Sequence, residues 1–354
     1  MKWKFNIADK SFMIESGLAE CPLLKINGFK PFYKGEVSED DSTDRAAADT
    51  ILYYSSMGKL SDMQSELEFT RNTKPLHEFD FSDNEEIHCA LYRQDARYYF
   101  TMHPSKGQML LSIAQKKDER RFEVVCNWEE NKNAGMLRFS LWMGITMALL
   151  EYEETMFHSS VIVYKGQAVM CLGESGTGKS THTRLWRENI TGSHLLNDDS
   201  PIVKIVKPAE KNIQGNGAVA LSSSAAGQIE KIVEDNSAAE EIAADSSAAN
   251  SQVEVFGGAW SGKTPCFKNE HYPLKAIIRI VRAKQNKITR LSTLNAFGAI
   301  YPSCPPALEK DTYFEDKICD ILSSILENIP VYTLECLPNA DAAYTSFNEI
   351  FRIK

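Results

Sequence analysis

The sequence has no excess of positive charge. Lys and Arg together number 39 against 48 Asp and Glu, which leaves a net charge of −9 at pH 7. A protein that binds nucleic acid needs clustered Lys and Arg to meet the phosphate backbone. The most basic stretch, residues 116–121, is interrupted by Asp118 and Glu119, and we interpret it as a solvated turn. The charge balance therefore argues against nucleic acid as the main partner.

Long hydrophobic runs are also missing. The best apolar run, residues 141–150, is too short to span a bilayer and predicts a buried helix. Residues 1–5 are not followed by the apolar core that a signal peptide requires. We therefore expect a protein that has no membrane partner.

Closely spaced cysteine pairs are the third absence. The eight cysteines are scattered along the chain and none forms a C-x-x-C pair. Zinc sites and redox motifs use such pairs, and small secreted domains use dense disulfide frameworks. The pattern predicts reduced cysteines, mostly in the core, and a cytoplasmic protein with neither a structural zinc site nor a disulfide framework.

The length and composition indicate a soluble globular protein. The 354 residues suffice for one large or two ordinary domains, and the chain is 43% hydrophobic and 25% charged. We predict a strand-rich N-terminal domain at residues 1–133, an antiparallel sheet that caps, presents or dimerises the second part. Its expected strands are residues 5–7, 11–14, 50–54, 88–93, 97–102, 109–114 and 122–126.

A second domain is expected at residues 134–354. It begins with a helix at residues 134–152, whose apolar positions recur at steps of three and four and so predict one apolar face. Strand, loop, helix and strand then alternate with further antiparallel strands, which predicts an α+β fold with a phosphate-loop core. The expected strands are residues 161–164, 168–172, 194–197, 201–206, 253–256, 274–282 and 331–334, and the expected helices are residues 181–188, 314–326 and 340–351.

Residues 207–252 differ in composition from their surroundings. This segment is rich in Ala, Ser and Glu and contains no aromatic residue. Such a stretch buries too little apolar surface to offset the entropy lost on ordering. We therefore predict a flexible insertion in the second domain.

The strongest motif is a segment that fits G-x-x-x-x-G-K-[ST], the phosphate-binding loop. An apolar run suited to a strand precedes it, and a segment that can continue as a helix follows; a plain glycine-rich turn is the alternative. Glycines let the backbone fold back so that its N–H groups face a polyphosphate at a helix N-terminus. Lys179 would reach the terminal phosphates and the Ser180 hydroxyl would ligate Mg²⁺. The expected nucleotide-binding residues are Gly173, Glu174, Ser175, Gly176, Thr177, Gly178, Lys179, Ser180 and Thr181.

Two adjacent carboxylates, Asp198 and Asp199, end the strand expected after that helix. Phosphoryl transfer needs a metal held opposite the loop and a group that orients or deprotonates the nucleophile. One carboxylate can lie near Mg²⁺ and the other near the acceptor; a solvated acidic turn is the alternative. His158 starts the strand pair before the loop and is placed to neighbour the carboxylates, although a lone histidine is more often structural.

At these residues the sequence resembles the catalytic domain of HPr kinase/phosphorylase and the related nucleotide site of phosphoenolpyruvate carboxykinase. The similarity is carried by His158, the segment GESGTGKST and the Asp-Asp pair; it is strong over residues 158–199, weak over the rest of the C-terminal half, and does not reach the first third. The resemblance implies ATP, or another phosphoryl donor, with Mg²⁺ and a protein serine as acceptor. It implies that Asp199 accepts the proton, that Asp198 lies close to the metal and that His158 assists.

The chain departs from the family at two places. The family has a Mg²⁺-binding glutamate before an arginine-glycine pair; Glu254 in VEVFGG corresponds to it, but the arginine is absent. Residues 329–339 also lack the arginine of the family's C-terminal signature, which puts phosphorylase activity and HPr itself as partner in doubt.

Residues 260–264 predict a loop with an exposed Trp260 and with Lys263, which either closes over substrate or forms a surface hairpin. Arg184 and Arg187 are expected on the helix after the glycine-rich loop, where a solvated face is favoured and recognition of an acceptor is the alternative.

The sequence therefore predicts a Mg²⁺-dependent kinase that binds ATP and transfers phosphate to a hydroxyl acceptor, either a protein serine or a small molecule. A carboxykinase-like lyase and a nucleotide-binding regulatory module with little turnover are the alternatives. The resemblance also makes a homo-oligomer an expectation. The candidate catalytic residues are His158, Lys179, Asp198 and Asp199, and the candidate metal ligands are Ser180, Asp198 and Glu254.

Overall fold

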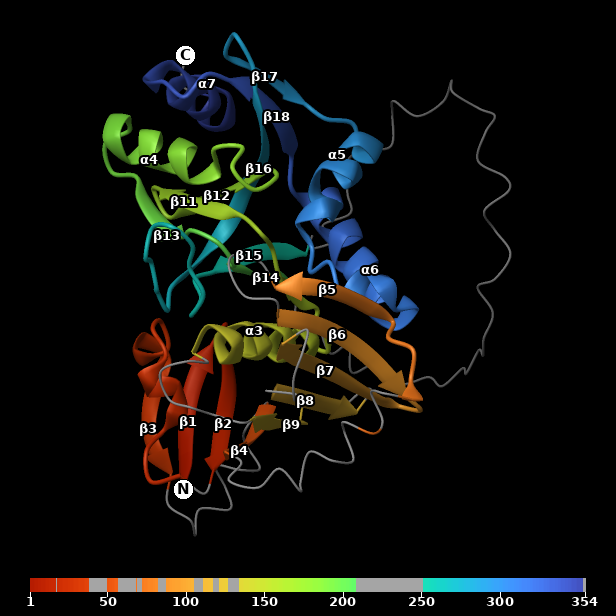
Figure 1. The fold of residues 1–354 in the computed structure, drawn as a ribbon. Helices are drawn as coiled ribbons and strands as arrows, with labels where there is room; N and C mark the ends of the chain where they lie inside the picture. The colour runs from red at the N-terminus through yellow and green to blue at the C-terminus, as the bar shows by residue number, and fades with distance from the viewer. Residues whose placement is uncertain are drawn as a thin grey trace, which may run out of the picture.

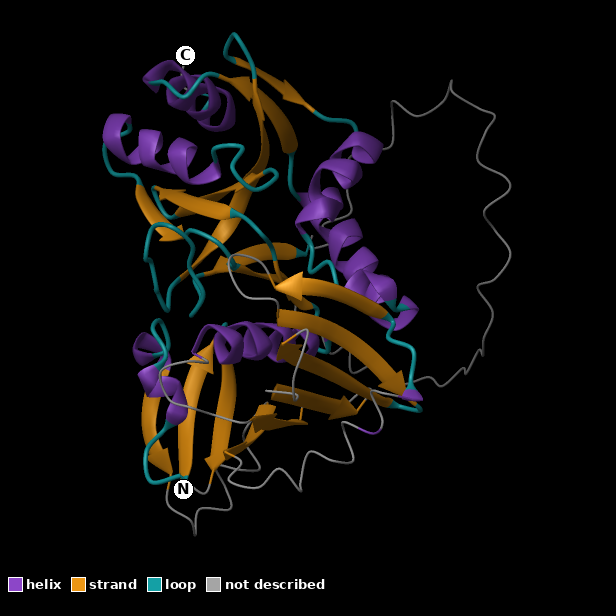
Figure 2. Cartoon of the chain, viewed as in Figure 1, coloured by secondary structure: helices purple, strands orange, loops and turns teal. Residues whose placement is uncertain are grey.

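A computed structural model describes residues 1–16, 18–37, 50–56, 68, 72–81, 87–104, 111–116, 121–126, 134–207 and 251–352. The described chain contains two mixed β-sheets and five α-helices (Figures 1 and 2). The prediction of an α+β fold is confirmed at this level. The predicted insertion at residues 207–252 lies outside the described residues except at its two ends, as do residues 117–120 of the predicted basic turn.

The first sheet has nine strands in the order β3-β1-β2-β4-β9-β8-β7-β6-β5. In β1 the alternating residues Trp3, Phe5 and Ile7 are buried, as expected for a strand with one covered face. The strands are β1 (Lys2–Ile7), β2 (Lys10–Ser16), β3 (Tyr33–Val37), β4 (Thr50–Ser56), β5 (His77–Phe81), β6 (Ile87–Gln94), β7 (Arg97–Pro104), β8 (Leu111–Lys116) and β9 (Arg121–Cys126), with the short 3-10 helices η1 (Pro22–Lys25) and η2 (Lys30–Phe32) between β2 and β3.

The prediction that this sheet is antiparallel is wrong at its centre. Strand β4 runs parallel to both of its neighbours, β2 and β9. Neither pair is consecutive in the chain, so neither is joined by a tight hairpin turn, which would force the antiparallel direction. The alternation of apolar residues reports which face of a strand is buried, but it does not report the direction of the neighbouring strand.

Helix α3 (Ala134–Leu150) lies between the two sheets (Figure 1). It contacts β7 and β8 on one side and β10 and α6 on the other. Every residue from Met143 to Leu150 is buried, so the prediction of a single apolar face is wrong for this part. A helix that packs against partners all round is apolar all round. The apolar residues of the first sheet, α3 and one face of the second sheet join into one core.

The second sheet is organised around the long strand β16, which pairs with β12 and β18 in parallel and with β15 in the antiparallel direction. Its strands are β10 (Glu154–Met156), β11 (Ser160–Tyr164), β12 (Gln167–Leu172), β13 (His194–Asn197), β14 (Ile202–Val206), β15 (Gln252–Phe256), β16 (His271–Arg282), β17 (Lys287–Arg290) and β18 (Val331–Cys336). Its helices are α4 (Lys179–Asn189), α5 (Thr293–Ile300), α6 (Thr312–Asn328) and α7 (Ala340–Phe351), with η4 (Tyr301–Ser303) and η5 (Leu308–Lys310).

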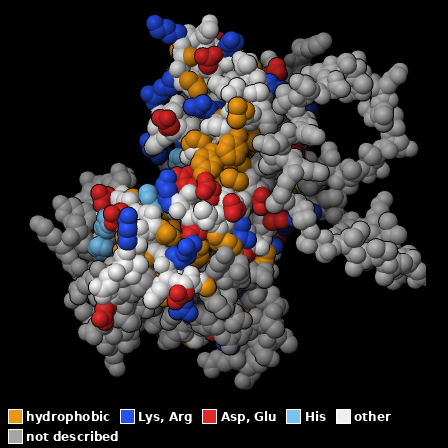
Figure 3. Space-filling model, turned by 90° about the vertical axis from the view of Figure 1, so that its right-hand side faces the viewer, with side chains coloured by type: hydrophobic (Ala, Val, Ile, Leu, Met, Phe, Trp, Pro, Cys, Tyr) orange, Lys and Arg blue, Asp and Glu red, His pale blue; other side chains and the backbone are white. Residues whose placement is uncertain are grey.

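Helices cover both faces of this sheet. Helices α4 and α7 pack on one face with apolar residues such as Trp186 and Phe347, and α5 and α6 pack on the other face (Figures 1 and 2). Figure 3 looks onto the side on which α5 and α6 lie and shows hydrophobic side chains gathered in its upper half. Among the described residues, Leu294 of α5 is the most exposed large hydrophobic side chain, at 82%.

Two buried carboxylates connect the first half of the molecule, residues 1–133, to the second half, residues 134–354. Asp311, the N-cap of α6, accepts hydrogen bonds from Tyr98 Oη and Arg93 Nη1 of the first sheet, both at 2.8 Å, and from the backbone N–H of Tyr313 at 3.1 Å. Glu154 of β10 lies 3.4 Å from Lys10 Nζ and 4.0 Å from Lys204 Nζ, but neither of its oxygens accepts a hydrogen bond within the described structure.

The described cysteines agree with the sequence prediction. Seven of them are free thiols, and Cys21, Cys89, Cys171, Cys304 and Cys336 are buried. Burial raises the pKa of each of these five. In the described part of the chain, no helix combines the length and the apolar character that crossing a membrane requires.

Candidate functional site

The glycine-rich segment forms the turn between β12 and α4, as its sequence predicts. Gly173 has a φ of 145°, and a Cβ atom there would lie 2.6 Å from Thr177 Oγ1 and 3.2 Å from Ile280 O, so only glycine fits. Arg282 of β16 donates a hydrogen bond to Gly176 O. Because α4 begins at Lys179, the turn lies at the N-terminal end of that helix, where backbone N–H groups lack intrahelical partners.

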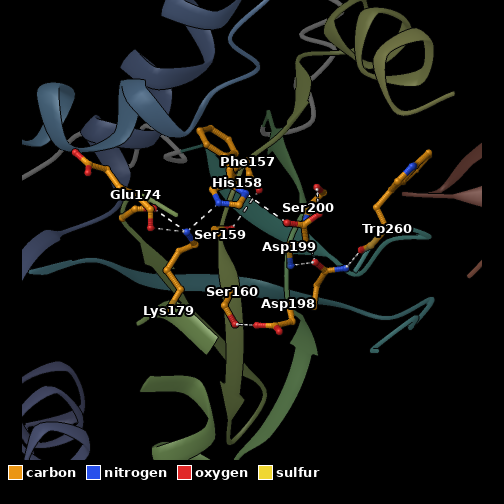
Figure 4. A network of polar contacts seen from close by, with 12 residues as sticks. Phe157, His158, Ser159, Ser160, Glu174, Lys179, Asp198, Asp199, Ser200 and Trp260 are labelled. Carbon is orange, nitrogen blue, oxygen red and sulfur yellow. Dashed lines mark hydrogen bonds and ion pairs between the residues drawn. The ribbon is translucent and has the colours of Figure 1, made fainter. Parts of the chain in front are cut away.

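Lys179 directs its ammonium group back toward the turn (Figure 4). Its Nζ lies 2.7 Å from Gly173 O, 3.2 Å from Glu174 O and 2.9 Å from His158 Nε2. An ammonium group has three protons and no acceptor, so these contacts use all three. Burial lowers the pKa of Lys179, and the charges of Asp199 and Asp198 act against this change. Two of the three acceptors are neutral carbonyl groups, so an anion would compete with them for the same protons.

His158 connects Lys179 to Asp199. Its Nε2 faces the ammonium group and therefore acts as the acceptor, which leaves the ring proton on Nδ1. Nδ1 lies 3.3 Å from Asp199 Oδ1. A neutral imidazole in this tautomer satisfies both contacts. The side chains of His158 and Asp199 are 49% and 35% exposed, so both can be reached from solvent.

Asp198 has a different environment from its neighbour Asp199. It is 4% exposed. One of its oxygens accepts a hydrogen bond from Ser160 Oγ at 2.7 Å, and the other accepts one from the backbone N–H of Thr264 at 3.0 Å. Ser160 is also 3.0 Å from Thr183 Oγ1 of α4. These contacts fix Asp198 between β11, α4 and the chain that follows β15.

The turn at Asn197 separates the two carboxylates. Asn197 Oδ1 accepts hydrogen bonds from the backbone N–H groups of Asp199 and Ser200, both at 2.9 Å, while its Nδ2 donates to Trp260 O at 2.8 Å. A side-chain amide that binds the backbone two residues on stabilises a turn. Ser200 Oγ donates to Asp199 Oδ2 at 3.1 Å. The two aspartates therefore leave the strand in different directions.

These residues line a cleft of about 310 Å³. The structure brings together most of the predicted site residues there; those that line it are His158, Ser175, Gly176, Gly178, Lys179, Ser180, Thr181, Asp198 and Asp199. Gly173 and Glu174 contribute carbonyl oxygens to Lys179, and Thr177 donates its hydroxyl to Glu174 O at 2.8 Å.

Glu254 is not among the residues that line the cleft. It lies on β15, and its Oε2 is 4.0 Å from His271 Nε2. Its assignment as a metal ligand stays a prediction. Within the described residues, no group of three or more His, Cys, Asp and Glu side chains is placed to hold a metal ion.

The loop at residues 260–264 adjoins the site. Ser261 forms a β-bridge with Asp199, the N–H of Gly262 donates to Asp198 O at 3.0 Å, and Lys263 lines the cleft. The expectation that Trp260 is exposed is wrong: it is 3% exposed. Its Nε1 donates to Arg138 O at 2.9 Å and its ring meets Phe29 edge-on, with 5.2 Å between the ring centroids, because the first half of the molecule covers it.

Two further cavities border the cleft. One of about 410 Å³ shares Gly176, Gly178 and Thr181 with it and has apolar walls that include Leu185 and Pro338. The other, of about 520 Å³, shares His158 and Asp199 with the cleft. The three cavities thus form a row in which the glycine-rich turn separates the first two, and His158 and Asp199 separate the last two.

Sequence reasoning missed several residues that shape the site. Asn197 was detectable, because Asn before two aspartates and a serine is a turn signal. Ser160, Thr264 and Arg138 carry no such signal, since they reach the site only through strand pairing and through the packing of α3 against the second half.

A scan against protein-family models gives no match for this chain, and a search of curated proteins gives none either.

Proposed function

We propose that the protein is a Mg²⁺-dependent phosphotransferase that binds ATP and transfers its terminal phosphate to a hydroxyl acceptor. The observation that carries the proposal is the line of contacts from Lys179 through His158 to Asp199, at the edge of a cleft whose wall is a glycine-rich turn at a helix N-terminus. In this line the cation at one end can bind phosphate, and the carboxylate at the other end can accept a proton, with the neutral imidazole between them.

The polyphosphate would lie on the turn between β12 and α4. Backbone N–H groups at a helix N-terminus favour anions. Lys179 would exchange its contacts with Gly173 O and Glu174 O for phosphate oxygens, which are stronger acceptors because they are charged. The adenine ring of ATP would occupy the neighbouring cavity of about 410 Å³, where Leu185 and Pro338 offer apolar walls. This cavity shares residues with the cleft on the side away from Asp199.

Asp199 would take the proton of the acceptor. In the reaction the acceptor oxygen forms a bond with the terminal phosphorus, the bond from that phosphorus to the bridging oxygen breaks, and ADP leaves with the electron pair. The proton of the hydroxyl passes to Asp199. The N–H of His158 orients the carboxylate, while Lys179 stabilises charge on the phosphate. General bases of this kind contribute about 10²–10⁴-fold to a rate.

The cleft offers oxygen ligands that suit Mg²⁺. Ser180 and Asp198 both line it, and hydroxyl, carboxylate and phosphate oxygens are the ligands that this ion prefers. Mg²⁺ keeps several waters and binds through one or two protein groups plus phosphates, so a small protein donor set fits it. When bound, the ion would neutralise charge on the phosphates. We further propose that the second sheet and its helices have the fold type of HPr kinase or phosphoenolpyruvate carboxykinase. The proposed chemistry fits a hydroxyl acceptor on either a protein or a small molecule.

The test compares the wild type with Asp199→Asn for ATP binding by calorimetry and for ADP formation in the presence of Mg²⁺. We expect equal ATP binding and a turnover at least about 100-fold lower in the variant. Asp316→Asn serves as the matched control, because Asp316 lies on an exposed position of α6, away from the cleft.

Three results would contradict the proposal in different ways. Equal turnover in both proteins removes Asp199 as the base. ATP binding without phosphate transfer or release in the wild type favours a regulatory nucleotide-binding module. Formation of phosphoenolpyruvate from oxaloacetate and ATP favours a carboxykinase-like lyase.

A further inference from the structure

A large cavity adjoins the cleft on the side of His158 and Asp199. Its volume is about 520 Å³, within the range of pockets that hold one small molecule. It lies where α3 meets the loop at residues 257–264 and the turn around Pro302. The two residues that it shares with the cleft are the proposed base, Asp199, and His158, which orients that base, so a molecule in this cavity can present a hydroxyl group to Asp199.

The walls of the cavity are mainly aromatic and apolar. Phe139 and Trp142 of α3 stack on each other, with 5.6 Å between the ring centroids and 13° between the ring planes. Trp260 forms a further wall and is held by its hydrogen bond to Arg138 O and by Phe29. Pro302 also lines the space. Arg138, His158, Asp199 and Ser200 supply the polar side chains of the lining, and the remaining walls suit a flat apolar body better than a polyol.

One group in the cavity can bind an anion. Arg138 is the cationic side chain among the lining residues. It donates a hydrogen bond to Asn27 O, which engages only part of the five-donor guanidinium group. Burial lowers the pKa of Arg138, and the negative charge of Asp199 acts against this change.

We propose that this cavity is the acceptor site and that it binds a small aromatic hydroxy acid, with the ring among Phe139, Trp142 and Trp260 and the carboxylate on Arg138. The proposal rests on the proposed phosphotransferase function. The acceptor hydroxyl faces Asp199, gives up its proton to that carboxylate and forms the new bond to the terminal phosphorus of ATP as ADP leaves.

The first test measures binding without ATP, through the change in tryptophan fluorescence that a ligand beside Trp142 and Trp260 causes. The probes are 3-phenyllactate, 2-phenylethanol, which lacks the carboxylate, and glucose as a polyol. We expect 3-phenyllactate to bind at least about 10-fold more tightly than 2-phenylethanol, the ratio that a hydrogen bond to a charged group gives, and glucose to cause no change. Equal binding of the two phenyl compounds in the wild type overturns the proposal without the use of any variant.

Variants locate the site. Arg138→Gln should weaken 3-phenyllactate binding at least about 10-fold and leave 2-phenylethanol binding unchanged. Trp142→Leu removes the aromatic ring that stacks on Phe139, and should weaken binding several-fold. Arg184→Gln, an exposed arginine on α4 outside the cavity, is the matched control and should bind as the wild type does. Unchanged binding of 3-phenyllactate by both Arg138→Gln and Trp142→Leu overturns the assignment.

Phosphate transfer separates this proposal from the proposed function. 3-Phenyllactate should accept phosphate from ATP, whereas 3-phenylpropionate, which lacks the hydroxyl, should bind and block the transfer. If 3-phenyllactate binds in an Arg138-dependent way but ATP does not bind, the cavity stands as a ligand site and the phosphotransferase falls. If a seryl peptide accepts phosphate while 3-phenyllactate does not bind, the phosphotransferase stands and the aromatic acid is wrong.

Discussion

The two halves of the molecule use their polar side chains for different purposes. In the first sheet, Arg93 and Tyr98 reach across to a carboxylate of the second half. In the second half, the polar contacts of His158, Lys179 and Asp199 converge on a cleft, and no described residue of the first sheet lines that cleft. The fold thus separates groups that hold the halves together from groups that are placed for chemistry. Stability and activity should therefore respond to different substitutions.

The largest expected effect is at Lys179. Lys179→Met keeps the apolar length of the side chain but removes the cation that faces the cleft. We expect turnover to fall about 1000-fold, the loss of roughly 4 kcal/mol of transition-state stabilisation that removal of one electrostatic group can cause. The melting temperature should change little, because the three acceptors belong to residues that solvent reaches, so water can replace the lost donor. Steady-state kinetics and calorimetric melting measure both quantities, with Lys275→Met on an exposed position of β16 as control. A large loss of stability in Lys179→Met contradicts the separation of the two halves' roles.

The second effect is at Asp311 and should be the converse. Asp311→Ala leaves the buried hydroxyl of Tyr98 and the N-terminus of α6 without their acceptor. A buried donor without a partner costs about 1–3 kcal/mol and a lost N-cap about 1 kcal/mol, so we expect a loss of roughly 3 kcal/mol in the free energy of unfolding. Arg93 is half exposed and can turn to water, so its charge adds little.

Urea unfolding measures this loss. Turnover well below the melting temperature should stay within about twofold of the wild type, since Asp311 lines none of the three cavities. Asp311→Asn keeps one acceptor oxygen and should lose less stability than Asp311→Ala. Equal losses of stability in the two variants would show that the hydrogen bonds to Asp311 do not stabilise the contact between the two halves.

The third effect depends on pH and arises at Glu154. Burial raises the pKa of this carboxyl from 4.5 to about 7, since Lys10 and Lys204 only partly offset the loss of water. The folded protein therefore binds this proton more tightly than the unfolded chain. The contribution of Glu154 to stability is fully present below pH 4.5 and is lost as the pH rises to about 7. We expect Glu154→Gln to raise the free energy of unfolding by roughly 3 kcal/mol at pH 8 and to change it little at pH 4.5.

The measurement is the difference between variant and wild type in urea unfolding at several pH values. The difference is needed because His182 has the opposite effect: burial lowers its pKa from 6.5 to about 4, so its contribution is present above pH 6.5 and is lost as the pH falls to about 4. A difference that does not depend on pH contradicts the titration of Glu154.

The smallest effect is expected at Arg184. Its guanidinium pairs with Glu188 one helical turn away, at 2.8 Å, and both side chains are about half exposed. Exposed pairs at this spacing contribute about 0.3–0.5 kcal/mol. Arg184→Ala should change stability by no more than this and should not change turnover, as the predicted solvated face implies. A clear loss of turnover would place the acceptor on α4 instead of α3.

The parts of the structure that the sequence predicts are those with a local cause. The turn at residues 173–178 follows from its glycines, and α4 follows from the segment after them. The proximity of His158 to Asp199 depends on the pairing of β11 with β13, with Val161 opposite Asn197. The sequence predicts both strands, and their order around the glycine-rich turn made this pairing an expectation.

The remaining parts depend on contacts between distant segments. The parallel direction of β4, the burial of α3 on all sides and the burial of Trp260 follow from how the halves meet. Arg138 reaches its cavity from a helix that carries no recognisable motif. No local pattern reports such contacts, because the same apolar residues would serve equally well in another packing arrangement.

The pairing of β14 with β15 has a consequence for chain length. Val206 and Gln252 face each other at the ends of the two strands, so the ladder that supports Ser200 and Gly257 is closed independently of the length of the connection. The entropy of closing a connection grows only with the logarithm of its length, about 0.6 kcal/mol for each doubling. Residues can therefore be inserted into or deleted from the connection between β14 and β15 while the distances among His158, Lys179 and Asp199 are preserved.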